Sequence, residues 1–248
     1  MAVTVNGQGI TVVEYQGELQ RYQAGLQAAG QTVPAEGEQA AAVQQELIYQ
    51  LLLAQAAGEY GCAQDDASLQ TRLDGTISAV GGPDAFNTWL QQNFYDAATF
   101  QTAFKRNSAA ACVRDALTAA VPATAPQVHA RQIRVLSEAS ARGYLAQLQA
   151  GAAFDDLAAQ VDPVTRGDLG WFPQGYLAQS AVDSAAFTLA LGAYSDVITT
   201  EVGYHIIYIV EKEDAHPLTP DALLFVQQQA VENWLRGRQS AASVVITP

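Results

Sequence analysis

The stretch from Gly167 to His205 constrains the fold more than any other part of this 248-residue chain. It begins with the turn GDLG, continues through Trp171 and Phe172 to a second turn, PQG, and then enters the apolar run SAVDSAAFTLA. Hydrophobic residues at helical spacing predict a short helix there, and Gly192 suits the left-handed position after a helix end. The strand-like run YHIIYIVEK follows. This order of turns, helix and strand is typical of a mixed α and β domain.

The same order of motifs resembles a known family. The turn, the aromatic pair, the short helix, GxYSDVI and GYHII are similar to the C-terminal half of the parvulin-type (PpiC, rotamase) peptidyl-prolyl cis/trans isomerase domain. The resemblance places that domain at residues 127–213. It implies a four-stranded antiparallel sheet surrounded by helices, with a shallow apolar pocket for a proline ring.

The first 126 residues predict a mostly helical region. In VTVNGQGI, Val3 and Val5 alternate with polar residues, as in a strand, and NGQG supplies a tight turn. Thr11 stands three residues before Glu14, the spacing of a capping box, so a helix should begin there. Further on, Asp65 or Asp66 can cap a helix, and Pro83 suits the first position of another.

Two more helical segments and a linker complete this region. The segments are DAATFQTAFKRN and SAAACVRDALTAAV, and the linker is PATAP. Proline disfavours helix at its own position and at the preceding residue, so PATAP should separate the helical region from the domain that follows.

This helical region resembles the N-terminal chaperone region of SurA/PrsA-type foldases of the bacterial envelope. The motifs that carry the resemblance are VNGQGIT, ELIYQLLLAQAA, GGPDAFNTWL and the closing helix that leads into VHARQI. In that family the parvulin domain is inserted into a helical domain that the C-terminus completes. The resemblance implies an α+β protein with a chaperone domain at 1–126, a parvulin domain at 127–213 and a returning segment at 214–248.

The returning segment carries its own packing pattern. TPDALLFVQQQAVENWLRGRQ predicts an amphipathic helix. Its candidate packing residues are Leu224, Val231, Trp234 and Leu235. We expect residues 244–247 to pair with residues 3–5 and so close the helical domain; the alternative is a frayed tail without a partner.

Composition excludes several classes of partner. The net charge is −13 with few, scattered cations, so nucleic-acid binding is not expected. The longest apolar run, LIYQLLLAQAA, is interrupted by Gln50 and Gln55 and is too short to span a bilayer. No leader pattern precedes Val3, so we expect that any export signal or anchor has been removed or never existed.

The cysteines leave two interpretations open. The chain has two cysteines, Cys62 and Cys112, which are too few to define a disulfide framework. They could be buried small hydrophobes, or they could form a disulfide between neighbouring helices, which would point to an oxidising compartment. The histidines show no metal-ligand spacing with each other or with the cysteines, so we predict neither a metal nor another cofactor.

Candidate site residues follow from the parvulin resemblance, position by position. His205 of GYHII matches the second of the family's two histidines; the alternative is a core histidine hydrogen-bonded to its neighbours for structural reasons. Thr200 matches a small hydroxyl position. Asp162 falls at the Cys/Asp position, although ordinary turn chemistry before a proline is the alternative. Leu169 matches the pocket leucine, and Leu177 replaces the family's methionine.

Other positions depart from the family pattern. Gln132 stands where ARHILV has its first histidine, because this chain reads ARQIRV. His129 lies three residues earlier, so in a strand it would face the opposite side of the sheet. The pocket phenylalanine is replaced by Ala181 or Val182. We assign Gln132 to the catalytic set, and Val182 and Phe172 to the peptide-binding set.

The resemblance implies a peptidyl-prolyl isomerase and chaperone that assists the folding of exported proteins outside the cytoplasm. Its partners would be unfolded or proline-containing polypeptides. Gln132 and the missing phenylalanine predict reduced turnover. The alternative function is a holdase whose parvulin domain binds peptide without turnover, and a degenerate interaction module within an envelope assembly is a third.

Overall fold

The computed structural model describes residues 1–247, in which nine α-helices and seven β-strands form two compact units. Unit 1 contains Met1–Ala120 and the chain from Gln229 onward, and unit 2 contains Val121–Gln228. The predicted α+β fold, with a helical region and a four-stranded antiparallel sheet among helices, is confirmed.

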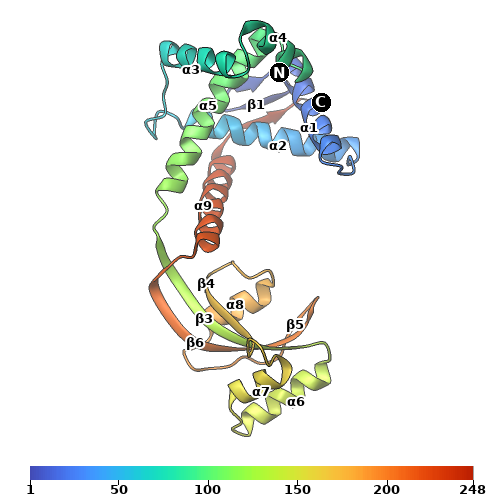
Figure 1. Ribbon diagram of the computed structural model, residues 1–248, viewed down its shortest axis with the longest axis vertical. Helices are drawn as coiled ribbons and strands as arrows, with labels where there is room; N and C mark the ends of the chain where they lie inside the picture. The colour runs from blue at the N-terminus through green and yellow to red at the C-terminus, as the bar shows by residue number, and fades with distance from the viewer. Residues whose placement is uncertain (248) are drawn as a thin grey trace. The chain divides into compact units, whose positions relative to one another are not determined.

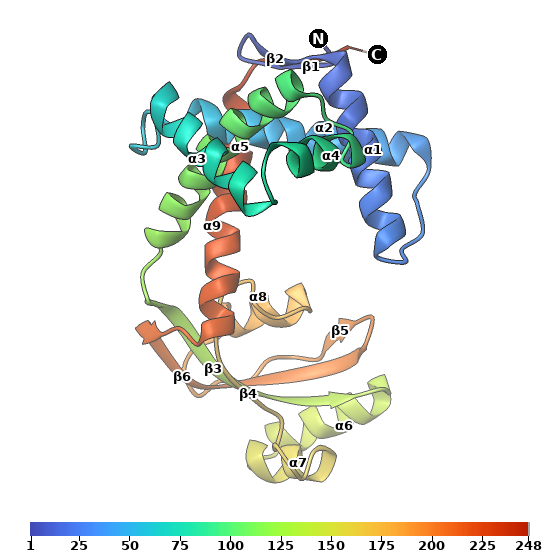
Figure 2. The ribbon, with the colours of Figure 1, turned by 45° about the horizontal axis from the view of Figure 1, so that its top comes forward.

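Unit 1 joins the two ends of the chain in one small sheet. Its strands are β1 (Val3–Val5), β2 (Gln8–Ile10) and β7 (Val244–Ile246), in the order β2-β1-β7. Both neighbours of β1 are antiparallel, and Val3 lies opposite Ile10 on one side and Ile246 on the other. The predicted pairing of the two ends is confirmed, and Figure 2 shows the termini side by side.

Unit 1 contains the helices α1 (Val12–Ala28), α2 (Glu36–Gln55), α3 (Asp66–Ala79), α4 (Pro83–Gln92) and α5 (Ala97–Ala119). Three of these helices, α1, α3 and α4, begin where the capping signals predict. Thr11 and Glu14 form the predicted capping box of α1. Asp65 caps α3 by accepting from the backbone N–H of Ser68, and Pro83 opens α4.

Helix α5 corrects one prediction. The sequence analysis divides this region into two segments after Asn107, whereas the structure has one continuous helix. Neither proline nor glycine interrupts the run, so nothing ends the helix locally. Tertiary contacts also favour continuity, because the buried Arg106 Nη1 donates to the buried Glu14 Oε1 at 3.1 Å.

The core of unit 1 forms around α2, with α5 and helix α9 (Pro220–Ala241) packed against it. Leu47, Leu53 and Val113 are almost completely buried. From α9, Leu235 is buried and Trp234 Nε1 donates to the hydroxyl of Tyr60 at 2.8 Å. Residues 231, 234 and 235 therefore pack as predicted. Leu224 does not, since it is 55% exposed in the first turns of α9.

Cys62 and Cys112 form a disulfide, with their Cα atoms 5.7 Å apart. Cys62 is buried in the unit 1 core, and Cys112 on α5 packs against the same core. The structure thus decides between the two interpretations that the sequence leaves open.

Unit 2 is built on the sheet β4-β3-β6-β5. Its strands are β3 (Thr124–Val135), β4 (Asp168–Pro173), β5 (Ile198–Thr200) and β6 (Gly203–Pro217). Its own helices are α6 (Glu138–Gln149), α7 (Phe154–Val161) and α8 (Ser180–Thr188). Figure 1 shows α6 and α7 on one face of the sheet and α8 on the other.

Strand β3 begins inside the predicted PATAP linker, which is a second correction. Thr124 already pairs with Pro217, and Ala125 pairs with His216. The register shifts between Ala125 and Gln127, so Pro126 occupies an irregularity where its missing N–H breaks no ladder bond. The buried Gln127 Nε2 donates to the carbonyl of His216 at 2.8 Å and stabilises this extension.

Candidate functional site

The two faces of the unit 2 sheet carry different cores. On the face covered by α8, Val128, Phe172 and Ile207 form one buried cluster. On the face covered by α6 and α7, Ile133 and Ile206 belong to another. Because side chains alternate along a strand, Gln132 and His205 lie on the α8 face.

A hydrogen-bonded chain crosses three strands on the α8 face. Gln132 on β3 accepts through Oε1 from His205 Nδ1 on β6, at 2.9 Å. The other ring nitrogen, Nε2, lies 2.9 Å from the Thr200 hydroxyl on β5. An amide oxygen can only accept, so Nδ1 carries the proton. Nε2 of the neutral ring then faces the Thr200 hydroxyl, whose single proton lies within reach of both Nε2 and the Gly203 carbonyl. The structure therefore brings together three of the predicted site residues.

His205 occupies the interior of this chain and is 3% exposed. Its two ring nitrogens are both used, and its ring offers almost no surface to a ligand. Gln132 and Thr200 are only half-buried. The geometry makes His205 a positioning residue that orients the amide and hydroxyl on either side of it.

Half-buried hydrophobic residues lie on the same face. Leu169, Leu177 and Ile198 pack at the margin of the cluster that contains Phe172. Ile198 pairs directly with His205 across β5 and β6. Sequence reasoning missed Ile198, although its position two residues before Thr200 on one strand places both side chains on one face.

Phe172 and Val182, predicted to bind peptide, lie deeper. They are 1% and 3% exposed, respectively, and both belong to the buried cluster beneath α8. These two side chains pack beneath the apolar surface and contribute almost no exposed area to it.

A β-bulge explains the direction of Leu169. Ala130 pairs with Gly170, but Arg131 pairs with Asp168, so Leu169 is an extra residue on β4. An extra residue reverses the alternation of side chains, which turns Leu169 onto the Phe172 face despite the odd spacing between them. Gly170 adopts the left-handed conformation, with φ of 66°.

Asp183 is a supporting residue that the sequence analysis did not identify. Its carboxylate is buried and accepts from the backbone N–H of Gly175 at 2.8 Å and from that of Leu177 at 3.2 Å. These bonds tie the PQGYL turn to α8 and hold Leu177 at the edge of the apolar surface. The signal that could have found it is that Asp183 is the one charged residue of SAVDSAAFT.

Asp162 is satisfied within its own turn. Its carboxylate accepts from the backbone N–H groups of Val164 and Thr165, each at 3.1 Å, and from the Thr165 hydroxyl. The Thr165 hydroxyl and then the Thr165 N–H hold the pKa of Asp162 below its ordinary value. This is the turn chemistry that the sequence analysis gives as the alternative, and the Gln132–His205–Thr200 chain is complete without Asp162.

His129 faces away from this site, as predicted. Its ring lies 2.8 Å from Asp168 Oδ1 and 5.7 Å from the ring of Trp171. The Trp171 ring also stacks with that of His216, with the ring centroids 3.9 Å apart. Trp171 and His129 alternate with Phe172 and Val128 along their strands, so this aromatic group occupies the opposite face of the sheet.

Burial and, to a smaller extent, the neighbouring charge of Arg134 lower the pKa of His205 below 6.5. The folded state therefore favours the neutral ring, while the unfolded chain takes up a proton as the pH falls through 6.5. The stability that this preference contributes is present above pH 6.5 and is lost as the pH falls toward the folded-state pKa. An NMR titration of the His205 ring should give a midpoint below 6.5. A midpoint at or above that value would contradict the hydrogen-bonded chain as described.

Within residues 1–247, His, Cys, Asp and Glu side chains form no group of three or more suited to holding a metal ion. None of the helices described is long and apolar enough to cross a membrane.

Comparison with known proteins divides the chain in a similar way. Residues 120–213 match the family model of the PPIC-type PPIASE domain. Residues 1–104 match that of the SurA-like N-terminal domain.

Curated relatives match only part of the chain. The foldase protein PrsA of Geobacillus sp. (strain WCH70) is 38% identical over 97 residues, which cover 37% of this chain and 35% of that protein. The PrsA protein of Caldanaerobacter subterraneus subsp. tengcongensis is 39% identical over 85 residues, or 32% of this chain and 28% of that protein. The matches thus span about a third of the length of these relatives.

Among solved structures, that of peptidylprolyl isomerase (PrsA) from Bacillus cereus has a TM-score of 0.50 and 21% sequence identity. The alignment covers 78% of this chain and 74% of that chain, which supports the fold over both units.

Proposed function

Residues 120–213 belong to the PPIC-type isomerase domain family and residues 1–104 to the SurA-like N-terminal domain family, and from this premise we propose that the chain is a prolyl isomerase and chaperone for unfolded polypeptides. The observation that carries the proposal is the Gln132–His205–Thr200 chain beside the half-buried Leu169, Leu177 and Ile198.

This arrangement suits a reaction that makes and breaks no covalent bond. Rotation about an X–Pro bond faces a barrier of about 18–20 kcal/mol, because the planar amide is stabilised by resonance. An apolar surface that holds the proline ring and excludes water disfavours the polar planar amide relative to the twisted one. Leu169, Leu177 and Ile198 supply that surface, while the Gln132 amide and Thr200 hydroxyl supply polar contacts at its edge.

Gln132 lowers the expected turnover. An amide keeps the hydrogen bond to His205 but cannot titrate as a histidine does. The proposal is therefore an isomerase of modest activity, with His205 holding the two polar groups in place. Asp162 remains a candidate catalytic residue only indirectly. Its turn leads into Gly167, whose carbonyl accepts from the backbone N–H of Gln132 at 2.8 Å.

The helical unit supports the chaperone half of the proposal. A pocket of about 460 Å³ lies between α3 and α5, and its lining is mixed: Leu69, Leu73 and Phe104 are apolar, whereas Asp66, Gln70, Gln101, Thr102 and Lys105 are polar or charged. A pocket with this mixed lining offers unfolded chains both apolar and polar contacts outside the isomerase domain. The Cys62–Cys112 disulfide is typical of oxidising compartments, so we place the protein outside the cytoplasm, where foldases of exported proteins act.

The proposal predicts that His205→Ala lowers kcat/KM on a Leu-Pro peptide at least about tenfold, because it leaves Gln132 and Thr200 without their shared partner. A protease-coupled isomerisation assay measures this. Leu177→Asp should act in the same direction by placing a charge on the apolar surface. His216→Gln, on the opposite face of the sheet, is the matched histidine control and should retain wild-type activity.

The same variants separate the isomerase from the holdase. Turnover that is unchanged in both His205→Ala and Leu177→Asp would refute the assignment of the site. Suppression of client aggregation by a chain without measurable turnover would instead favour the holdase alternative.

A further inference from the structure

Within residues 1–247, some lysines and arginines of unit 2 have an ion-pair or hydrogen-bond partner and others have none. Three of them have partners: Arg131 pairs with Asp155, Arg142 pairs with Glu138, and Lys212 donates to the carbonyl of Phe187. Among the residues that the structure describes, the two other cations of this unit, Arg134 and Arg166, have neither an ion pair nor a side-chain hydrogen bond. The chain has 25 acidic residues and 12 lysines and arginines, so a positively charged patch contrasts with its net charge of −13.

Both unpaired arginines flank the site described above. Arg134 pairs with His205 across β3 and β6, and is two residues from Gln132 on the same strand. Directly opposed residues of an antiparallel pair share a face, so Arg134 lies on the face of Gln132 and Ile198. Arg166 immediately precedes Gly167, whose carbonyl accepts from the backbone N–H of Gln132.

Both arginines are also open to solvent. The charge of Arg134 is close enough to His205 to contribute to the lowering of its pKa. Asp196 and Glu201 lie on either side of β5 but, within residues 1–247, form no ion pair with Arg134 or Arg166. The site face therefore carries a guanidinium charge that no carboxylate of the described chain neutralises.

Resting on the proposed function, we infer that Arg134, with Arg166, makes the site select polypeptides that carry an aspartate or glutamate immediately before the target proline. A guanidinium binds a carboxylate through charge-assisted and often paired hydrogen bonds. A lysine at the same position of the peptide would meet like charge and bind less well. The position is distinctive, since the family pattern ARHILV has leucine where this chain has Arg134.

The experiment compares three peptides that differ only in the residue before proline: glutamate, leucine or lysine. For the wild-type full chain we expect kcat/KM to be about twofold to fivefold higher with glutamate than with lysine, the scale of solvent-exposed ion pairs. The ratio should fall toward one when the ionic strength rises from about 0.02 M to about 0.5 M, because salt screens exposed charges.

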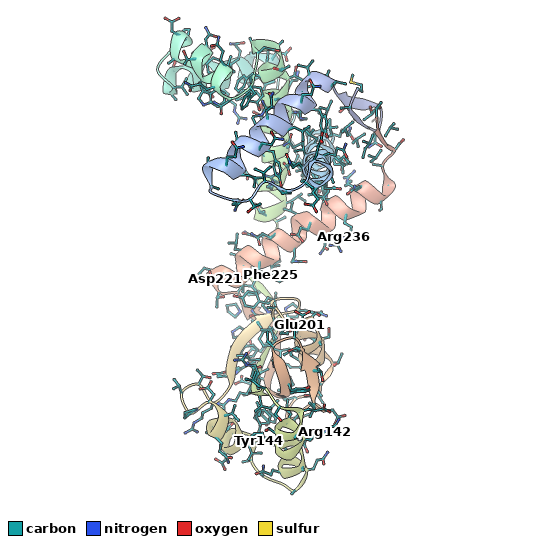
Figure 3. The ribbon with its side chains drawn as sticks, turned by 90° about the vertical axis from the view of Figure 1, so that its right-hand side faces the viewer. Arg142, Tyr144, Glu201, Asp221, Phe225 and Arg236 are labelled. Carbon is teal, nitrogen blue, oxygen red and sulfur yellow. A yellow bond between two sulfur atoms is a disulfide. The ribbon has the colours of Figure 1, made fainter. Side chains whose placement is uncertain are left out.

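Arg134→Glu should invert the preference, so that the lysine peptide becomes the better substrate. Arg166→Glu should change it in the same direction. Arg142→Gln is the matched control, since Figure 3 shows Arg142 on helix α6, apart from Glu201 at the turn after β5, and it should keep the wild-type ratio.

The outcomes distinguish this inference from the proposed function. Turnover of all three wild-type peptides at equal rates, or an unchanged ratio in Arg134→Glu, would overturn the selectivity alone. Absence of turnover on every peptide would contradict the isomerase activity. In that case the dissociation constants of fluorescently labelled versions still decide the inference, because equal binding of the glutamate and lysine peptides would overturn it.

Discussion

Replacing Gly167 with alanine should destabilise unit 2 by at least about 4 kcal/mol, a loss that few single substitutions reach. Gly167 has φ of 68°, a conformation in which alanine is strained. An added Cβ would also lie 1.9 Å from the carbonyl oxygen of Gln132. Strand β3 cannot move aside, because it is paired with β4 on one side and β6 on the other.

Gly170→Ala is the matched control for this prediction. Gly170 has nearly the same φ, 66°, but nothing lies within 4 Å of an added Cβ. Its cost should be the conformational strain alone, about 1–2 kcal/mol. Hydrogen exchange of the β3 and β6 amides in the full chain reports on unit 2 separately from unit 1. Equal protection in the two variants would show that the close approach to Gln132 does not exist.

Removing the disulfide should have the second-largest effect, a loss of about 4 kcal/mol in unit 1. The bond joins residues separated by 50 positions, so it removes much of the freedom of the unfolded chain. Cys62→Ala/Cys112→Ala tests this in urea, with the fluorescence of Trp234 as the probe of the core that contains Tyr60. Reductant should lower the wild-type midpoint and leave that of the double variant unchanged. A wild-type midpoint that does not respond to reductant would contradict a structural disulfide.

Local features of the fold could be predicted because their causes lie within a few residues. The side chains of Thr11 and Glu14 each accept a hydrogen bond from the backbone N–H of the other residue, and Asp65 caps the first turn of its helix. The Leu169 and His205 positions could be named because GDLG and GYHII resemble motifs of the parvulin family.

Features that depend on distant partners could not be predicted in the same way. Helix α5 continues through Asn107 partly because Arg106 is buried against Glu14, 92 residues away. Strand β3 extends back to Thr124 because residues 213–217 are available to pair with it. The choice between a disulfide and two buried thiols likewise depends on how α5 packs against the chain after α2.

The site shows the same division. Its residue types could be predicted from motif positions, but not the depth at which they lie. Phe172 and Val182 are core residues, and His205 acts from beneath Gln132 and Thr200. The sequence alone is consistent with Asp162 in either the turn or the site. Its hydrogen bonds from Val164 and Thr165 are what identify it as a turn residue.

The central claim is that the α8 face of unit 2 accelerates rotation about X–Pro bonds. Two-dimensional NMR exchange on a Leu-Pro peptide measures that rotation directly, without a coupling protease. Uncatalysed exchange takes tens of seconds or longer. With a catalytic amount of the full chain, exchange cross-peaks should appear at mixing times of about a second, and they should weaken strongly with His205→Ala. Cross-peaks no stronger than those of the peptide alone would contradict the claim.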